Sequence, residues 1–154
     1  MIQRKQSLFL LISAILMASS VFVPFMQFAS STGSVYINAF EIVNYESDIL
    51  EQSASIKTLG ITIIIIAIVN IISIFLFSKR PLQIRVVRYA ILLKCAIFAV
   101  LFYYTYLLSA SDTTFTIIPK TGVLALVIAL ILDWIAIRNI KKDEELVKSI
   151  DRIR

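Results

Sequence analysis

Two ionisable residues stand within long apolar stretches of this sequence and are its best candidates for chemistry. Lys94 follows Arg88 by six residues, and Asp133 precedes Arg138 by five. In helices that rise about 1.5 Å per residue, these two would lie about 9 Å and about 7–8 Å from the same end of their segments. A lone charge at the centre of a membrane helix costs about 2.5–3.5 kcal/mol, so we predict a contact between Lys94 and Asp133.

Two alternatives to this pair remain open. In the first, the Lys94 side chain extends to the lipid headgroups while Asp133 pairs locally or stays near water. In the second, the two residues form a proton or ion relay, as intramembrane charges do in pumps and transporters. Asn70, in another apolar stretch, is predicted to hydrogen-bond between helices, with a ligand contact as the alternative, and Ser13 is predicted to be a small packing residue.

Other chemistry-bearing groups are scarce. The chain has no histidine and a single cysteine, Cys95, which excludes a disulfide within the chain and a Cys/His zinc site. Haem would lack its usual histidine ligand. The sequence contains no recognisable nucleophile–base pair, metal-ligand cluster or phosphate-binding loop. We therefore predict a protein that is not an enzyme and that uses no cofactor.

The elements that would position these residues are membrane spans. Of the 154 residues, 59% are hydrophobic and 16% are charged, and the mean hydropathy is +0.90. A water-soluble domain of this size has too much surface for so few charges. Crossing a bilayer core about 30 Å thick takes roughly 20 helical residues, and runs of about that length occupy residues 7–28, 59–77, 89–108 and 118–137. We predict an all-α membrane protein, a single domain over residues 1–154 that forms a four-transmembrane-helix bundle.

The first run has a rival interpretation. Arg4 and Lys5 followed by an apolar core resemble a secretory signal peptide, and residues 17–19 are an acceptable cleavage site. However, the apolar stretch continues to Phe28, which makes it longer than the core of a typical signal peptide. We therefore predict a retained anchor, in which Pro24 produces a tolerable kink near the outer end.

Lysine and arginine predict the orientation, because they concentrate on the cytoplasmic side of membrane proteins. Twelve of the fifteen lie before the first run, in a cytoplasmic loop at residues 78–88 or in a tail at residues 138–154. The basic residues of that loop are Lys79, Arg80, Arg85 and Arg88. Only Lys57 and Lys120 fall on the opposite side. Both termini are therefore predicted to be cytoplasmic.

Residues 29–56 form the larger outer loop, which is acidic and contains no base. Residues 35–42 alternate in part between apolar and polar side chains, which favours a short strand. Residues 113–117, in the second outer loop, also have a β-forming composition. These segments predict a small two-stranded cap, a short β-hairpin, although such a unit is only marginally stable by itself.

Three stretches carry a family resemblance. They are MIQRKQ at the N-terminus, LFSKRPLQIRVVRYAILL at residues 76–93 and IRNIKKDEELVKSIDRIR at residues 137–154. Together they resemble a bacterial family of four-span inner-membrane proteins known as domain of unknown function 4293. The resemblance covers the whole chain in its layout of spans, and it is most specific in LQIR and in the tail. It implies the bacterial inner membrane but no activity, and the family pattern does not include Lys94 or Asp133.

The tail has a helical pattern of its own. One face would carry Leu146, Val147, Ile150 and Ile153. We predict that the fourth helix continues into the cytoplasm or breaks and lies on the membrane, where this face would rest on anionic lipid or dock on another protein. The basic loop is interpreted as a topology determinant, with a lipid-headgroup site as the alternative, and no nucleic acid is expected as a partner.

The function that fits these features is non-catalytic. We expect an accessory or scaffold subunit of a larger membrane assembly, whose partners are the lipid bilayer and another membrane-complex protein. The alternative is a small transporter or ion-coupled permease that acts as an oligomer, with Lys94, Asp133 and Asn70 along its path. Lipid sensing by the basic loop and the tail is a third hypothesis.

Overall fold

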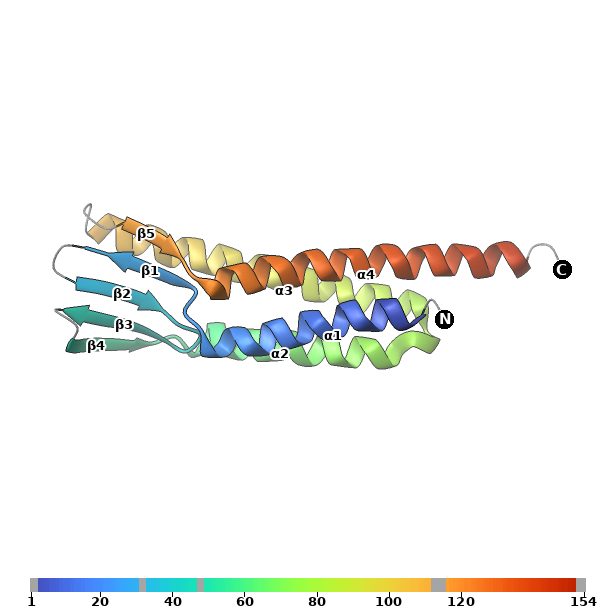
Figure 1. The fold of residues 1–154 in the computed structure, drawn as a ribbon, viewed down its shortest axis with the longest axis horizontal. Helices are drawn as coiled ribbons and strands as arrows, with labels where there is room; N and C mark the ends of the chain where they lie inside the picture. Colours follow the sequence, from blue (N-terminus) through green and yellow to red (C-terminus); the bar gives the residue numbers. More distant parts are fainter. Residues whose placement is uncertain (1–2, 31–32, 47–48, 112–115, 152–154) are drawn as a thin grey trace.

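The computed structural model describes residues 3–30, 33–46, 49–111 and 116–151. Within these residues the elements are α1 (Gln3–Ser19), the 3-10 helix η1 (Ser20–Phe22), β1 (Met26–Ala29), β2 (Gly33–Ile37), β3 (Glu41–Glu46), β4 (Ile49–Ser55), α2 (Lys57–Phe75), the 3-10 helix η2 (Leu76–Ser78), α3 (Arg80–Ser111), β5 (Thr116–Pro119) and α4 (Thr121–Asp151). The molecule is elongated, with the helices along its long axis and the strands gathered at one end (Figure 1). At the opposite end α4 extends past the other helices (Figure 1).

The four helices form a bundle in which α1 packs against α2 and α4, and α3 packs against the same two neighbours. Within the described residues, three helical segments are long and apolar enough to cross a membrane: Lys57–Phe75, Arg80–Leu108 and Thr121–Leu146. The apolar part of α1 and η1, Gln6–Phe22, is shorter. These segments indicate a membrane protein.

The outward faces of the helices are apolar. Exposed isoleucines on α2 include Ile61, Ile64 and Ile68, and exposed apolar residues on α4 include Leu124 and Ile128. In a bundle surrounded by water, these outward positions would be mostly polar. The surface of the bundle therefore suits contact with lipid.

The first apolar run is not one continuous helix. α1 ends at Ser19, and after η1 the chain becomes extended and enters β1 in the last part of the predicted span, residues 7–28. Val23 has an extended backbone (φ −125°, ψ 148°) because the ring of Pro24 disfavours a helical conformation in the residue before it. The prediction of a kinked helix that continues to Phe28 is therefore wrong.

The outer loop, residues 29–56, forms most of a sheet rather than half of a two-stranded cap. Five antiparallel strands are arranged in the order β4-β3-β2-β1-β5, and β5 returns after α3 to pair with β1. The strand predicted at residues 35–42 is interrupted after Ile37 by a tight turn, in which the backbone N–H of Asn38 donates to the carbonyl of Glu41 at 2.9 Å. The predicted segment 113–117 lies partly outside the described residues, and its described part belongs to β5.

The predicted cytoplasmic loop and tail are largely helical. α3 begins at Arg80, so most of the predicted loop 78–88 is the first part of a helix. A proline is tolerated in the first turn, where the backbone N–H groups have no helical partner, and Pro81 occupies such a position. α4 starts after β5 and therefore later than the predicted span 118–137, and it runs without interruption to Asp151. This confirms that the fourth helix continues into the tail, residues 138–154.

Backbone contacts join the sheet directly to the bundle. The N–H of Lys120 donates to the carbonyl of Phe25 at 2.9 Å, and the N–H of Gly122 donates to the carbonyl of Pro24 at 3.1 Å. A Cβ atom at Gly122 would lie only 2.8 Å from the carbonyl oxygen of Pro24. The start of α4 therefore packs against the segment between η1 and β1 at a distance that only glycine permits.

Candidate functional site

Four polar side chains, one from each helix, meet inside the bundle. Ser13 on α1, Asn70 on α2, Lys94 on α3 and Asp133 on α4 each have an exposed fraction of 0%. The ammonium group of Lys94 forms an ion pair with the carboxylate of Asp133. The same ammonium donates a hydrogen bond to Ser13 Oγ at 3.0 Å. We call these four residues the buried polar network.

The hydroxyl of Ser13 connects the parts of the network. Besides the bond from Lys94, its oxygen accepts a hydrogen bond from Asn70 Nδ2 at 2.9 Å, and it donates to the backbone carbonyl of Ala129 at 3.1 Å. Asn70 Nδ2 also lies 3.4 Å from Asp133 Oδ1. A hydroxyl has two lone pairs and one proton, so Ser13 uses its full hydrogen-bonding capacity. The network therefore links all four helices.

Apolar side chains enclose the network at both ends. One buried cluster, on the side of the sheet, includes Met17 and Ile97, and a second, on the opposite side, includes Leu10 and Val87. Electrostatic attraction is stronger in such apolar surroundings, and an unpaired polar group is correspondingly costly. The charges of the network therefore depend on one another rather than on water.

The contact predicted between Lys94 and Asp133 is confirmed. The alternative in which Lys94 extends to the headgroups is wrong, because its side chain is fully buried. Asn70 forms the predicted hydrogen bonds between helices. The part that Ser13 plays was missed, since a serine in an apolar helix looks like a packing residue until the register of its neighbours is known.

A second polar contact lies at the end of the bundle remote from the sheet. The side-chain amide of Gln6 donates to the carboxylate of Asp143, and both residues are less than a tenth exposed. The guanidinium of Arg80 donates to the backbone carbonyl of Asp143 at 3.0 Å. These bonds join the beginnings of α1 and α3 to α4. The sequence did not reveal them, because Gln6 and Asp143 stand among charged residues that look solvent-exposed.

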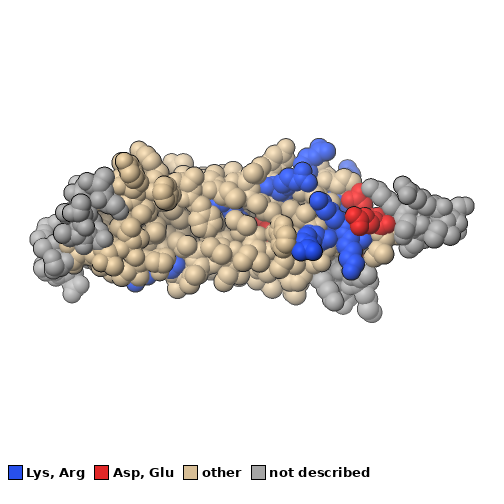
Figure 2. All heavy atoms as spheres, turned by 90° about the horizontal axis from the view of Figure 1, so that it is seen from above, with Lys and Arg blue, Asp and Glu red and all other residues tan. Residues whose placement is uncertain are grey.

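The basic residues predicted at 78–88 lie apart from the network. Lys79, Arg85 and Arg88 are exposed around the beginning of α3, while Arg80 is half-buried. Figure 2 shows Lys and Arg side chains gathered toward one end of the molecule, whereas the opposite half of this face is almost free of them. On α4 the guanidinium of Arg138 lies 4.8 Å from the ring centroid of Trp134.

Of the four side chains on the predicted tail face, the structure describes only the first, that of Leu146. Leu146 is 46% exposed. The side chains of Val147 and Ile150 lie outside the described part of the structure, and so does the whole of Ile153. α4 nevertheless supplies a continuous helical backbone up to Asp151, as the spacing of these residues requires.

A family model matches residues 2–153, almost the entire chain. The chain belongs to the family described as domain of unknown function DUF4293. This confirms the resemblance seen at the N-terminus, in LQIR and in the tail. No curated protein matches the chain. The description of the DUF4293 family gives no activity.

The geometry of the network is that of an ion pair enclosed within the bundle. All four side chains of the network are fully buried. Neither a cavity between α2 and α3 nor an apolar groove between α1 and α2 is lined by any of them. Within the described ranges, no three His, Cys, Asp or Glu side chains lie close enough together to hold a metal ion.

Proposed function

We propose that this protein is a non-catalytic membrane subunit that serves as an accessory or scaffold within a larger assembly. The observation that carries the proposal is that the side chains of the buried polar network bond the four helices to one another. A scaffold needs such a rigid bundle, and it needs surfaces outside the membrane that a partner can contact.

Two such surfaces support the proposal. The five-stranded sheet extends from one end of the bundle (Figure 1). At the other end, α4 continues for eight residues beyond Asp143, where Gln6 contacts it, which corresponds to about 12 Å of helix. Its residue Leu146 is a large apolar side chain that is exposed at this end. The sequence predicts that this extension is amphipathic, and an amphipathic helix is a common docking element.

The membrane arrangement that we propose has four spans, with both termini in the cytoplasm of a bacterium and the sheet outside its inner membrane. It is supported by the gathering of Lys and Arg at the end remote from the sheet (Figure 2). The first span would be the segment Gln6–Phe22, which contains no charged residue. Anionic lipid headgroups would contact the exposed bases at the cytoplasmic end.

The mass of the gently solubilised native protein tests the scaffold proposal. We expect the tagged chain, expressed at its natural level, to be recovered in a reproducible complex larger than the chain in its detergent. Leu146→Gln should weaken the complex, because it removes an exposed apolar contact, whereas the neighbouring change Glu145→Gln should leave it intact. Recovery of a lone monomer with no reproducible partner would contradict the proposal.

The alternative, an ion-coupled permease, would require Lys94 and Asp133 to exchange a proton or an ion during transport. Their enclosure between two apolar clusters favours a structural role instead. The double variant Lys94→Met/Asp133→Leu separates the two functions, because a scaffold would keep its complex while a permease would lose transport.

A further inference from the structure

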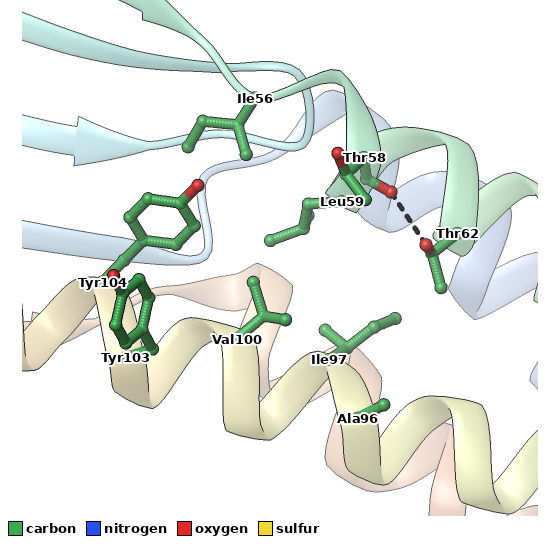
Figure 3. A pocket seen from close by; sticks show the side chains of 9 residues that line it. All are labelled: Ile56, Thr58, Leu59, Thr62, Ala96, Ile97, Val100, Tyr103 and Tyr104. Atoms are coloured by element: carbon green, nitrogen blue, oxygen red, sulfur yellow. Dashed lines mark hydrogen bonds between the residues drawn. The ribbon is translucent and has the colours of Figure 1, made fainter.

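A cavity opens between α2 and α3 near the end of the bundle that carries the sheet. Its volume is about 280 Å³. Nine residues line it: Ile56, Thr58, Leu59, Thr62, Ala96, Ile97, Val100, Tyr103 and Tyr104. Figure 3 shows the α2 side chains facing those of α3 across the gap, with the two tyrosine rings at one end of it. None of these residues belongs to the buried polar network.

The lining is amphipathic. The buried residues Ile56, Leu59 and Ile97 form its inner part and are at most 7% exposed. Hydroxyl groups occur at Thr58, Thr62, Tyr103 and Tyr104, and the Thr62 hydroxyl is already bonded to the backbone carbonyl of Thr58 at 2.8 Å. An apolar cavity without several polar partners does not hold water well. The inner part of the cavity therefore suits a hydrocarbon chain.

The position of the cavity along α2 narrows the choice of occupant. Lys57 begins α2 and is exposed, and it stands between two lining residues, Ile56 and Thr58. Thr62 is five residues further along, about 7–8 Å deeper into the bundle. The cavity thus lies at the level where a phospholipid changes from its charged headgroup to its acyl chains, and a base stands at its polar edge.

We propose that this cavity binds one acyl chain of a membrane phospholipid from the leaflet on the side of the sheet, with the anionic phosphate beside Lys57. Its walls are open to lipid, since the α3 residues Ala96 and Val100 are exposed on the surface of the bundle. The apolar groove between α1 and α2 is less amphipathic, because its lining has a single hydroxyl group, Ser7. This site goes beyond the scaffold proposal and does not depend on it.

Photo-crosslinking in reconstituted vesicles tests the site. The full-length chain would be placed in phosphatidylcholine vesicles that contain a small fraction of phosphatidylglycerol with a diazirine in the upper part of one acyl chain. Adducts would be mapped by peptide mass spectrometry. We expect about tenfold more adducts at Ala96 and Val100 than at Ala99, which is exposed on the same helix but does not line the cavity. An even distribution over the exposed faces of the helices would overturn the proposal.

Matched variants test the proposed lipid site in a second experiment. Ala96→Phe fills the cavity and should lower the adducts at Val100 about tenfold, while Ala99→Phe should leave them unchanged. Lys57→Gln should lower the yield with the phosphatidylglycerol probe, whereas Lys120→Gln, which changes the other base near the sheet, should not. Circular dichroism and thermal unfolding of the reconstituted protein report whether each variant is folded. Unaltered adducts at Val100 in folded Ala96→Phe or Lys57→Gln would refute the site.

Discussion

Neither Lys94 nor Asp133 would be tolerated alone in the interior of the bundle. Each is fully buried, and each has the other as its charged partner. The desolvation penalty of two buried ions is offset only when their geometry is good and further hydrogen bonds satisfy them. Ser13 and Asn70 supply those bonds. At the scale of single residues, the stability of the network therefore requires that each charge keep both its charged partner and its hydrogen bonds.

This dependence predicts non-additive effects on stability. Lys94→Met or Asp133→Leu alone should lower the free energy of unfolding by about 3–5 kcal/mol, because each leaves an uncompensated buried charge. The double variant should be much less destabilised than the sum of the two, since it removes both charges. The free energies of unfolding of the two single variants and of the double variant are measured in mild detergent, with circular dichroism as the readout.

The control is Arg88→Met, which removes an exposed charge from the same helix and should change stability little. Charge exchange gives an independent check. If Lys94→Asp/Asp133→Lys folds no better than either of its single changes, the attraction between the two charges does not hold α3 to α4.

At the scale of elements, hydropathy predicted where apolar segments lie but not all of their conformations. The run at residues 7–28 contains no charged residue throughout, yet its last part is a strand. An apolar strand that pairs with neighbours and covers a bundle has the same composition as the end of a membrane helix. The pairing of β1 with β5, which is about 90 residues away, depends on long-range contacts that periodicity does not contain.

The candidate site, like the fold, could be predicted from the sequence only in part. Equal depth was enough to pair Lys94 with Asp133, because a buried charge requires a partner. Ser13 and Gln6 were not identified, since nothing in a serine or glutamine shows which side of a helix it occupies. Their roles follow from the rotation of α1 relative to α4, which packing determines.

Close packing between elements predicts that an added methyl group is tolerated less well at Gly122 than at Gly60. Gly122→Ala should lower the free energy of unfolding by about 1–3 kcal/mol, because its Cβ would meet the backbone of Pro24 and Phe25, which cannot move aside. Gly60→Ala should cost less. The three atoms nearest to its Cβ all belong to the ring of Phe40, a side chain that is 38% exposed and therefore less confined than a backbone, and alanine favours the helix. Thermal unfolding of both variants measures the difference, and equal losses would contradict this account.

At the scale of the whole molecule, two helices are longer than a bilayer core. α3 has 32 residues and α4 has 31, which correspond to about 48 Å and about 46 Å of helix against a core of about 30 Å. Both must therefore extend beyond the hydrocarbon. α3 extends alongside the sheet, and α4 extends at the opposite end (Figure 1). The positive charge gathers at the end where α4 protrudes (Figure 2).

This asymmetry predicts the orientation of the protein, which single cysteines can test. In a Cys95→Ser background, Glu41→Cys on the sheet should react with a membrane-impermeant maleimide added to intact spheroplasts. Lys142→Cys on α4 and Arg85→Cys on α3 should react only after the membrane is permeabilised. All three positions are exposed, so a lack of reaction reflects the membrane rather than burial in the protein. Labelling of Lys142→Cys but not of Glu41→Cys in intact spheroplasts would mean that the positive charges are not retained in the cytoplasm and that the proposed orientation is inverted.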